Sequence, residues 1–80
     1  MGRDIKNELE DVLVEVLSIK REEIRKVNSL QELGVESLTL AELLAEIENK
    51  FGIDIPDEDA PKIINLEQAV AYIEQKVSDK

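Results

Sequence analysis

The stretch LGVESLTLAELLAEIENKF, residues 33–51, decides the fold of this chain. A turn around Gly34 leads into an amphipathic helix that we predict over residues 37–51, and Gly52 follows as a natural C-terminal cap. Acidic side chains cover one side of this helix, so its apolar stripe must pack against other elements. The residues predicted to face inward are Leu43, Leu44, Ile47 and Phe51.

Ser37 stands at the start of this helix, where a serine has two ordinary roles. It can cap the helix by accepting a hydrogen bond from a first-turn N–H, or its hydroxyl can be presented on the surface to another enzyme. The chain has no histidine that could activate this serine and no cysteine that could serve as a nucleophile in its place. Lys50, the only base within residues 31–59, lies about 20 Å away along the helix. We therefore predict that the protein is not an enzyme and has no catalytic residues.

Helical periodicity also marks the two ends of the chain. Apolar residues recur on one face of residues 4–17, with acids, Glu10 among them, over most of the remainder. Val14 falls off the apolar face and is predicted to be exposed. Asn65 begins a last helix, with Gln68 three positions later as in a capping box.

Two irregular segments connect these helices. Residues 18–36 form a long loop that apolar residues should pin across the helix ends, because so long a structureless loop is unusual in a compact domain. After the central helix, Pro56 favours a short helical turn at 57–61 that Pro61 keeps short or ends. The first loop also carries a small basic cluster, predicted to balance nearby acids, with a phosphate site as the alternative: Lys20, Arg21, Arg25 and Lys26.

These elements predict an all-α fold. They comprise three longer helices and a short third helix, with a long loop between the first two. The 80 residues are enough for one domain, 1–80, with a small core and little room for a deep catalytic cleft.

Charge and composition narrow the function further. The net charge is −9, and −8 of it falls within residues 31–59, around Ser37. Such a field repels nucleic acid and attracts basic protein surfaces. The acids at 54–59 lack the alternation, central glycine and terminal glutamate of an EF-hand, and without cysteine or histidine no metal site is predicted. No apolar run is long enough to span a membrane, so we expect a cytoplasmic protein.

Four motifs of this chain resemble those of one known family and keep the family's spacing. They are LGVESL at 33–38, EL at 42–43, Phe51, and IPDE at 55–58. Similar motifs at the same offsets occur in acyl carrier proteins, and the resemblance covers essentially the whole chain. Each motif alone is weak evidence, whereas the combination is specific.

The resemblance implies a function built on Ser37. A phosphopantetheinyl transferase would transfer 4′-phosphopantetheine from coenzyme A to this serine, and the thiol of that arm would carry acyl groups as thioesters. Acyltransferases and synthases with basic patches would dock on the acidic central helix. The fold would be a four-helix bundle with three longer helices and a short third helix, and the protein would act as a monomer. The charge and the hydropathy already predict that it binds no nucleic acid and spans no membrane.

The resemblance also carries individual positions over to this chain. The docking positions are Glu36, Leu38, Glu42, Ala45 and Glu48. The positions expected to form the core and to line a pocket for the acyl chain are Leu43, Leu44, Ile47, Phe51, Ile55, Ile63 and Ala69.

The chain departs from the usual pattern in ways that favour a specialised carrier, serving a dedicated acyltransferase or synthase of fatty-acid, lipid or polyketide synthesis. Glu36 replaces an aspartate that in the family helps the transferase to place its metal, and glutamate is the poorer N-cap. Residues 39–41, Thr-Leu-Ala, are closer to carriers of polyketide pathways than to housekeeping fatty-acid carriers. The other departures are Ser29 and Leu30 in place of an aromatic residue, and Pro61 and Ile64 in place of more polar ones.

Two other functions remain open at this point. The first is a peptidyl or aminoacyl carrier, a class that more often has two glycines where this chain has Gly34-Val35. The second is an unmodified helical module that uses its acidic helix to bind partner proteins. Loading by a transferase separates both kinds of carrier from the unmodified module.

Overall fold

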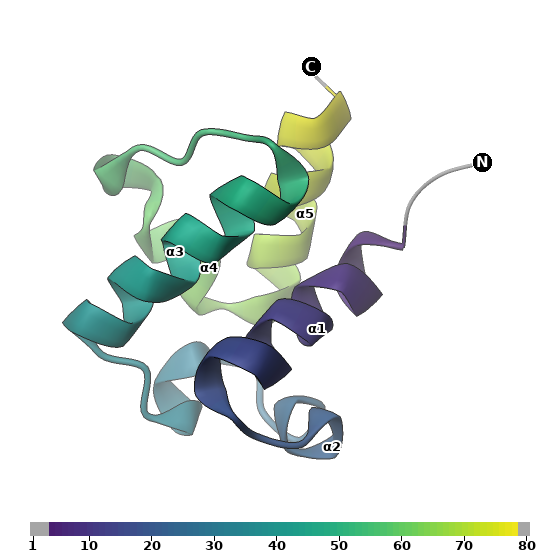
Figure 1. Cartoon of the computed structure of the whole chain (residues 1–80), viewed down its shortest axis with the longest axis vertical. Helices are drawn as coiled ribbons and strands as arrows, with labels where there is room; N and C mark the ends of the chain where they lie inside the picture. Colours follow the sequence, from purple (N-terminus) through teal and green to yellow (C-terminus); the bar gives the residue numbers. More distant parts are fainter. Residues whose placement is uncertain (1–3, 79–80) are drawn as a thin grey trace.

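A computed structural model describes residues 4–78, and the elements in that range are helices joined by turns and loops (Figure 1). The three longer helices are α1 (Ile5–Leu17), α3 (Ser37–Phe51) and α5 (Leu66–Ser78). Shorter helical segments fill the connections: α2 (Arg21–Ile24), η1 (Leu30–Leu33), η2 (Asp57–Asp59) and α4 (Pro61–Ile64). The predicted all-α bundle is confirmed, and so is the central helix over residues 37–51.

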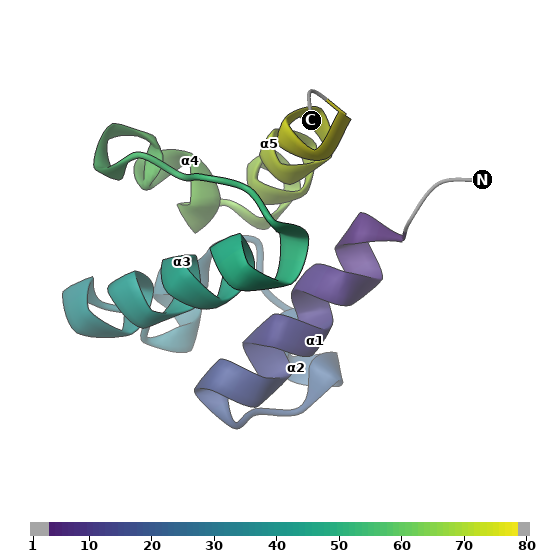
Figure 2. The same cartoon turned by 45° about the horizontal axis from the view of Figure 1, so that its top comes forward.

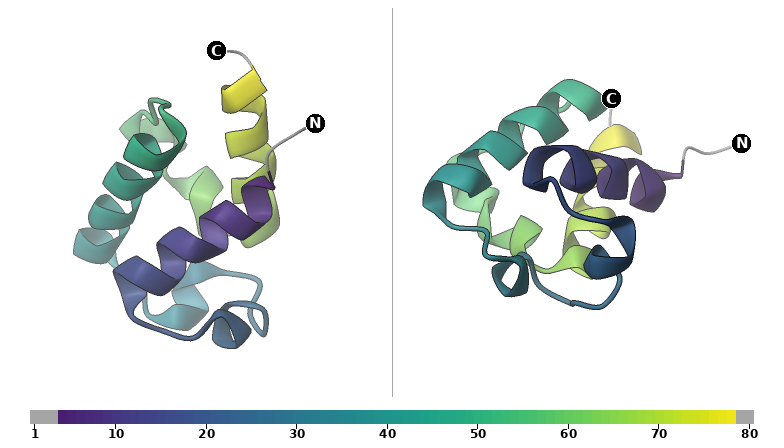
Figure 3. Two further views of the ribbon diagram at one scale, coloured as in Figure 1. Left: turned by 45° about the vertical axis from the view of Figure 1, so that its right-hand side comes forward. Right: turned by 60° about the horizontal axis from the view of Figure 1, so that its bottom comes forward.

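The core lies between the three longer helices. α1 packs across both α3 and α5. α3 and α5 run in roughly the same sense, whereas α1 runs opposite to α3 and crosses α5 at a steep angle (Figure 1 and Figure 3). Each element contributes an apolar stripe that it could not bury alone. The largest side chains with almost no exposed surface are Leu13, Ile24, Leu30, Leu43, Ile47, Phe51, Ile63 and Ile73.

α1 begins and ends close to its predicted bounds. Asp4 caps it by accepting a hydrogen bond from the N–H of Asn7 at 3.1 Å. Two residues do not face as expected. Val14, predicted to be exposed, is half-buried and packs against the core, because α1 contacts both α3 and α5 and so buries more than one stripe. Glu10, expected on the acidic outer face, is buried.

Glu10 is the buried end of an ion-pair cluster that joins α1 to α2. Its carboxylate accepts hydrogen bonds from Arg21 at 3.2 Å and from two nitrogens of Arg25 at 3.2 and 3.1 Å. Arg21 also contacts Asp11. The expectation that the basic cluster balances nearby acids is confirmed for these two arginines. The first loop is therefore a structured connection, with α2 held against α1.

The chain after α3 turns back along that helix before α5 begins (Figure 2). Gly52 adopts a left-handed conformation, φ 65°, and ends α3 as predicted. η2 ends before Pro61, but Pro61 then begins a further short helix, α4, instead of closing the helical segment. A proline at the first position of a helix loses no intrahelical hydrogen bond, which is why it is tolerated there.

α4 leads directly into α5 and packs mainly against it. The side-chain oxygen of Asn65 accepts a hydrogen bond from the N–H of Gln68 at 3.0 Å, which confirms Asn65 as the N-cap of α5. Ala69 and Ile73 then turn their side chains into the core.

Candidate functional site

Ser37 is the first residue of α3, and its side chain is exposed. The N-cap position belongs to Glu36, so the capping role considered for Ser37 is wrong by one residue. Within residues 4–78, no hydrogen-bond partner holds the Ser37 hydroxyl. The hydroxyl therefore faces solvent at the start of a helix and is accessible to another enzyme.

The backbone N–H groups at the start of α3 lack a side-chain cap. The Glu36 side chain makes no capping hydrogen bond, and the helical ladder starts where the N–H of Leu40 donates to the Glu36 carbonyl at 2.6 Å. The first-turn N–H groups lie at the positive end of the helix dipole. By contrast, Asp4 caps α1 and Asn65 caps α5. A phosphate group on Ser37 would meet donors that no side chain occupies.

The turn before Ser37 is fixed by η1. Ser29 and Glu32 form a capping box: the Ser29 hydroxyl oxygen accepts from the N–H of Gln31 at 3.1 Å, and the Glu32 carboxylate accepts from the N–H of Ser29 at 3.2 Å. Gly34 follows with φ 79°, a conformation that favours glycine, and ends η1. The Ser-x-x-Glu spacing at 29–32 is the sequence signal that could have predicted this element.

Ser37 borders a shallow, open depression, called here the Ser37 depression. Its lining comes from η1, from the turn between η1 and α3, from the start of α3 and from the last residue of α4: Gln31, Val35, Glu36, Ser37, Leu38, Thr39, Leu40 and Ile64. Gln31 and Ile64 were not predicted as site residues. Ile64 is distant from Ser37 in sequence, and only the path of the chain back along α3 brings it to this place (Figure 2).

Four of the five predicted docking positions are exposed: Glu36, Leu38, Glu42 and Ala45. Leu38 is 75% exposed and is the only large apolar side chain that is exposed within the described range. Glu48 differs, because it is half-buried and its carboxylate accepts a hydrogen bond from the N–H of Ile55 at 2.9 Å. Glu48 therefore also holds the loop that follows α3.

Six of the seven predicted core positions are buried: Leu43, Ile47, Phe51, Ile55, Ile63 and Ala69. Leu44 is half-buried and packs against the edge of the core. These side chains come from α3, α4, α5 and the loop after α3, so the structure brings the predicted set together beneath the exposed face of α3.

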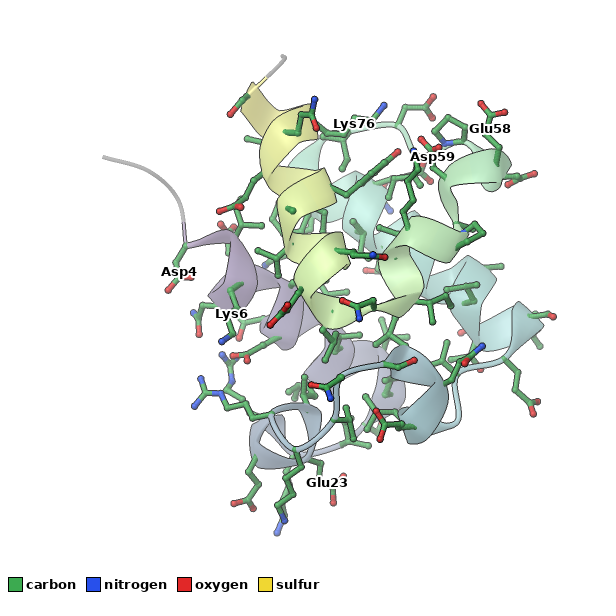
Figure 4. All side chains as sticks on the ribbon, turned by 180° about the vertical axis from the view of Figure 1, so that it is seen from behind. Asp4, Lys6, Glu23, Glu58, Asp59 and Lys76 are labelled. Carbon is green, nitrogen blue, oxygen red and sulfur yellow. The ribbon has the colours of Figure 1, made fainter. Side chains whose placement is uncertain are left out.

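The acids after α3 do not form a metal site. Among residues 4–78, no group of three or more acidic side chains is arranged to hold a metal ion. Asp59 instead accepts a hydrogen bond from the Tyr72 hydroxyl at 2.6 Å and pairs with Lys62 at 3.3 Å. The Tyr72 hydrogen bond lowers the pKa of the Asp59 carboxyl, and burial together with this bond raises the pKa of the Tyr72 phenol. Asp59 and Lys76 lie on the same side of the molecule in Figure 4.

Comparison with known proteins identifies the family. The sequence pattern of the family described as "Phosphopantetheine attachment site" matches residues 7–73. An acyl carrier protein of Chloroherpeton thalassium is 42% identical over 74 residues, which cover 91% of this chain and 92% of that protein. The chain belongs to the acyl carrier protein family. An acyl carrier protein of Campylobacter hominis, 39% identical over 79 residues, covers 96% of this chain and 99% of its own length.

Membership of the acyl carrier protein family fixes the kind of activity. The protein is a carrier and not a catalyst, and its prosthetic group is a covalently bound 4′-phosphopantetheine. The structure fits this group, because an exposed hydroxyl, uncapped N–H donors and a partly apolar depression occur together at the start of α3. Within the described residues, none of the helices combines the length and the apolar character that a membrane crossing requires.

Proposed function

We propose that Ser37 bears the phosphopantetheine arm and that the protein carries acyl groups on it as thioesters between partner enzymes. The observation that carries the proposal is the exposed Ser37 hydroxyl beside the uncapped N-terminus of α3. The prosthetic group is joined through a phosphodiester, whose negative charge is stabilised at the N-terminus of a helix.

The other three of the four serines are less suited to this role. Ser18 ends α1 in a left-handed conformation, φ 55°. The Ser29 hydroxyl takes part in the capping box of η1. Ser78 is the last residue of α5, where the negative end of the helix dipole opposes a phosphate group.

Loading of Ser37 requires a second enzyme. The Ser37 oxygen attacks the pantetheine-bearing phosphorus of coenzyme A, a new O–P bond forms, and the bond from that phosphorus to the 3′,5′-adenosine bisphosphate leaving group breaks. The serine proton must go to a base, and this chain has no histidine to accept it. We propose that the transferase supplies the base and that Glu36, adjacent to Ser37, helps to hold the transferase's metal.

The acidic face of α3 suits rapid, weak docking. Residues 31–59 carry −8 of the charge, and Leu38, Glu42 and Ala45 are exposed on one face of α3. Long-range attraction to basic patches raises association rates without tight binding, and a carrier must leave each partner soon after it docks. We propose that the partners are the transferase and the acyltransferases or synthases of a specialised fatty-acid, lipid or polyketide pathway in the cytoplasm. The protein acts as one monomeric carrier domain.

The growing acyl chain needs an apolar site, and we propose that it enters between α3 and α4. α4 packs mainly on α5 and makes few contacts with α3, so these two elements can part at small cost. Leu43 and Ile47 of α3 and Ile63 of α4 are buried, and we propose that they would line the opened space.

Loading can be tested by intact mass spectrometry. The protein is incubated with a phosphopantetheinyl transferase, magnesium and coenzyme A, and the mass should rise by one phosphopantetheine. Ser37→Ala should gain no mass while keeping its helical content, whereas the matched control Ser78→Ala should gain the full mass. Loading of Ser37→Ala, or no loading of the unchanged protein by several such transferases, contradicts the proposal.

A further inference from the structure

The Ser37 depression is lined in part by Ser37, the proposed attachment residue. Gln31 approaches it from η1, Leu40 from the second turn of α3 and Ile64 from the end of α4. We infer that the phosphopantetheine arm rests in this depression between visits to partner enzymes, with Leu40 and Ile64 as its apolar floor and Gln31 on its polar rim. This inference rests on the proposed attachment at Ser37.

The walls of the depression are held together by backbone hydrogen bonds. The N–H of Leu66 donates to the Asn28 carbonyl at 3.0 Å, and Ser29 and Asn65 form an antiparallel bridge. These contacts join the residues just before η1 to the residues just after α4. Gln31 and Ile64 are therefore fixed relative to one another before any arm is attached, so the arm does not have to order the site.

From the phosphate outward, each chemical group of the arm has a complementary group in the depression. The phosphate next to Ser37 meets the uncapped N–H groups of α3. The geminal dimethyl group follows along the arm, and the half-buried side chains of Leu40 and Ile64 offer it apolar contact. Amide groups come next, and the exposed side-chain amide of Gln31 can both donate to and accept from them. Beyond its phosphate the arm is uncharged, so the acidic field around Ser37 does not repel it.

Ile64 is the residue that makes the floor apolar on the α4 side. It is half-buried at the surface and not part of the closed core, so its side chain is available to a ligand. A more polar side chain at this position would leave the depression without apolar contact from α4. Ile64 is accordingly the positioning residue whose replacement should release the arm.

The test uses nuclear magnetic resonance of the loaded protein with no acyl group. After intact mass confirms full loading, we expect nuclear Overhauser contacts from the geminal methyl protons of the arm to the methyl groups of Leu40 and Ile64. Ile64→Thr replaces the ethyl branch with a hydroxyl group, so it should weaken the contacts to Leu40. The ratio of resting to free arm should fall by about fourfold or more, because the loss of one buried methylene group alone corresponds to about fourfold. Ile53→Thr is the matched control, because Ile53 is also half-buried but lies beyond the far end of α3.

The outcomes separate this inference from the function on which it rests. Full loading with arm contacts to Leu40 and Ile64 supports the resting site, provided that the contacts to Leu40 weaken in Ile64→Thr and stay unchanged in Ile53→Thr. Full loading of the unchanged protein, with chemical-shift changes confined to residues 36–38 and no contact to Ile64, overturns the inference and leaves the carrier function intact. This measurement on the unchanged protein decides the question even if a variant fails to fold. No gain in mass overturns both.

Discussion

The hydroxyl of Tyr72 on α5 donates a hydrogen bond to the Asp59 carboxylate of η2 at 2.6 Å. Lys62 and Lys76 lie over the Tyr72 ring, at 5.9 and 5.5 Å from its centre. The hydrogen bond joins η2, which precedes α4 in the chain, to α5, which follows it. The position of α4, and with it the position of Ile64 beside Ser37, therefore depends on a contact between residues that are 13 positions apart.

Ionisation of the Tyr72 phenol should lower the stability of the folded protein at alkaline pH. Burial and the bond to Asp59 raise its pKa, so the folded protein keeps a proton that the unfolded chain loses near pH 10. This contribution to stability is complete below pH 10 and declines as the pH rises further. Tyr72 is the only tyrosine, so tyrosinate absorbance reports on it alone. A midpoint near pH 10 in the folded protein would contradict the contact, and Tyr72→Phe should remove this part of the pH dependence.

Removal of the Glu10 charge should destabilise the fold. Glu10→Gln weakens the hydrogen bonds with Arg21 and Arg25 in a buried place, and we expect a loss of about 1–3 kcal/mol in the free energy of unfolding. Chemical denaturation measures this loss. Glu15→Gln is the control, because Glu15 is exposed on the same helix and should change stability by less than about 0.5 kcal/mol. Equal effects of the two substitutions would show that the cluster does not hold α2 to α1.

Stability should be far more sensitive to substitutions on the inward face of α3 than to substitutions on its outward face. Leu43→Ala leaves a cavity at a fully buried position and should cost about 2–5 kcal/mol, enough to unfold much of so small a domain. Leu38→Ala makes the same chemical change at a side chain that is 75% exposed, and its melting temperature should stay close to that of the unchanged protein. A reversed order in thermal denaturation would mean that the helix is rotated from its described position.

Glu36→Asp should stabilise the unloaded protein. Aspartate is a favoured N-cap and can accept a hydrogen bond from the first-turn N–H groups that Glu36 leaves uncapped, which contributes about 0.5–1 kcal/mol. The same donors are expected to meet the phosphate after loading, so the gain should be smaller in the loaded protein. Melting temperatures of the loaded and unloaded forms measure both effects. A larger gain in the loaded form would place the phosphate elsewhere.

The sequence predicts what depends on local periodicity and misses what depends on distant partners. The bounds and inward face of α3 follow from its 3.6-residue pattern and from Gly52, so they were predictable. The burial of Glu10 was not, because it requires Arg21 and Arg25 from another element. A predicted helix end is also uncertain by a residue or two, which is why Ser37 was considered as a cap when Glu36 holds that position.

The same distinction between local patterns and distant partners applies to the residues of the candidate site. Ser37 and the exposed face of α3 could be read from a contiguous motif and the helical repeat. Gln31 and Ile64 could not, because the contacts of Asn28 and Ser29 with Asn65 and Leu66 bring them to Ser37 only in the folded chain.

The most direct measurement is the location of the arm by fragmentation mass spectrometry on protein purified from its own host. We predict that phosphopantetheine, free or bearing an acyl thioester, is attached to Ser37 and is absent from fragments that carry Ser18, Ser29 or Ser78. An arm on any of those serines, or a protein that carries no arm in its host, would contradict it.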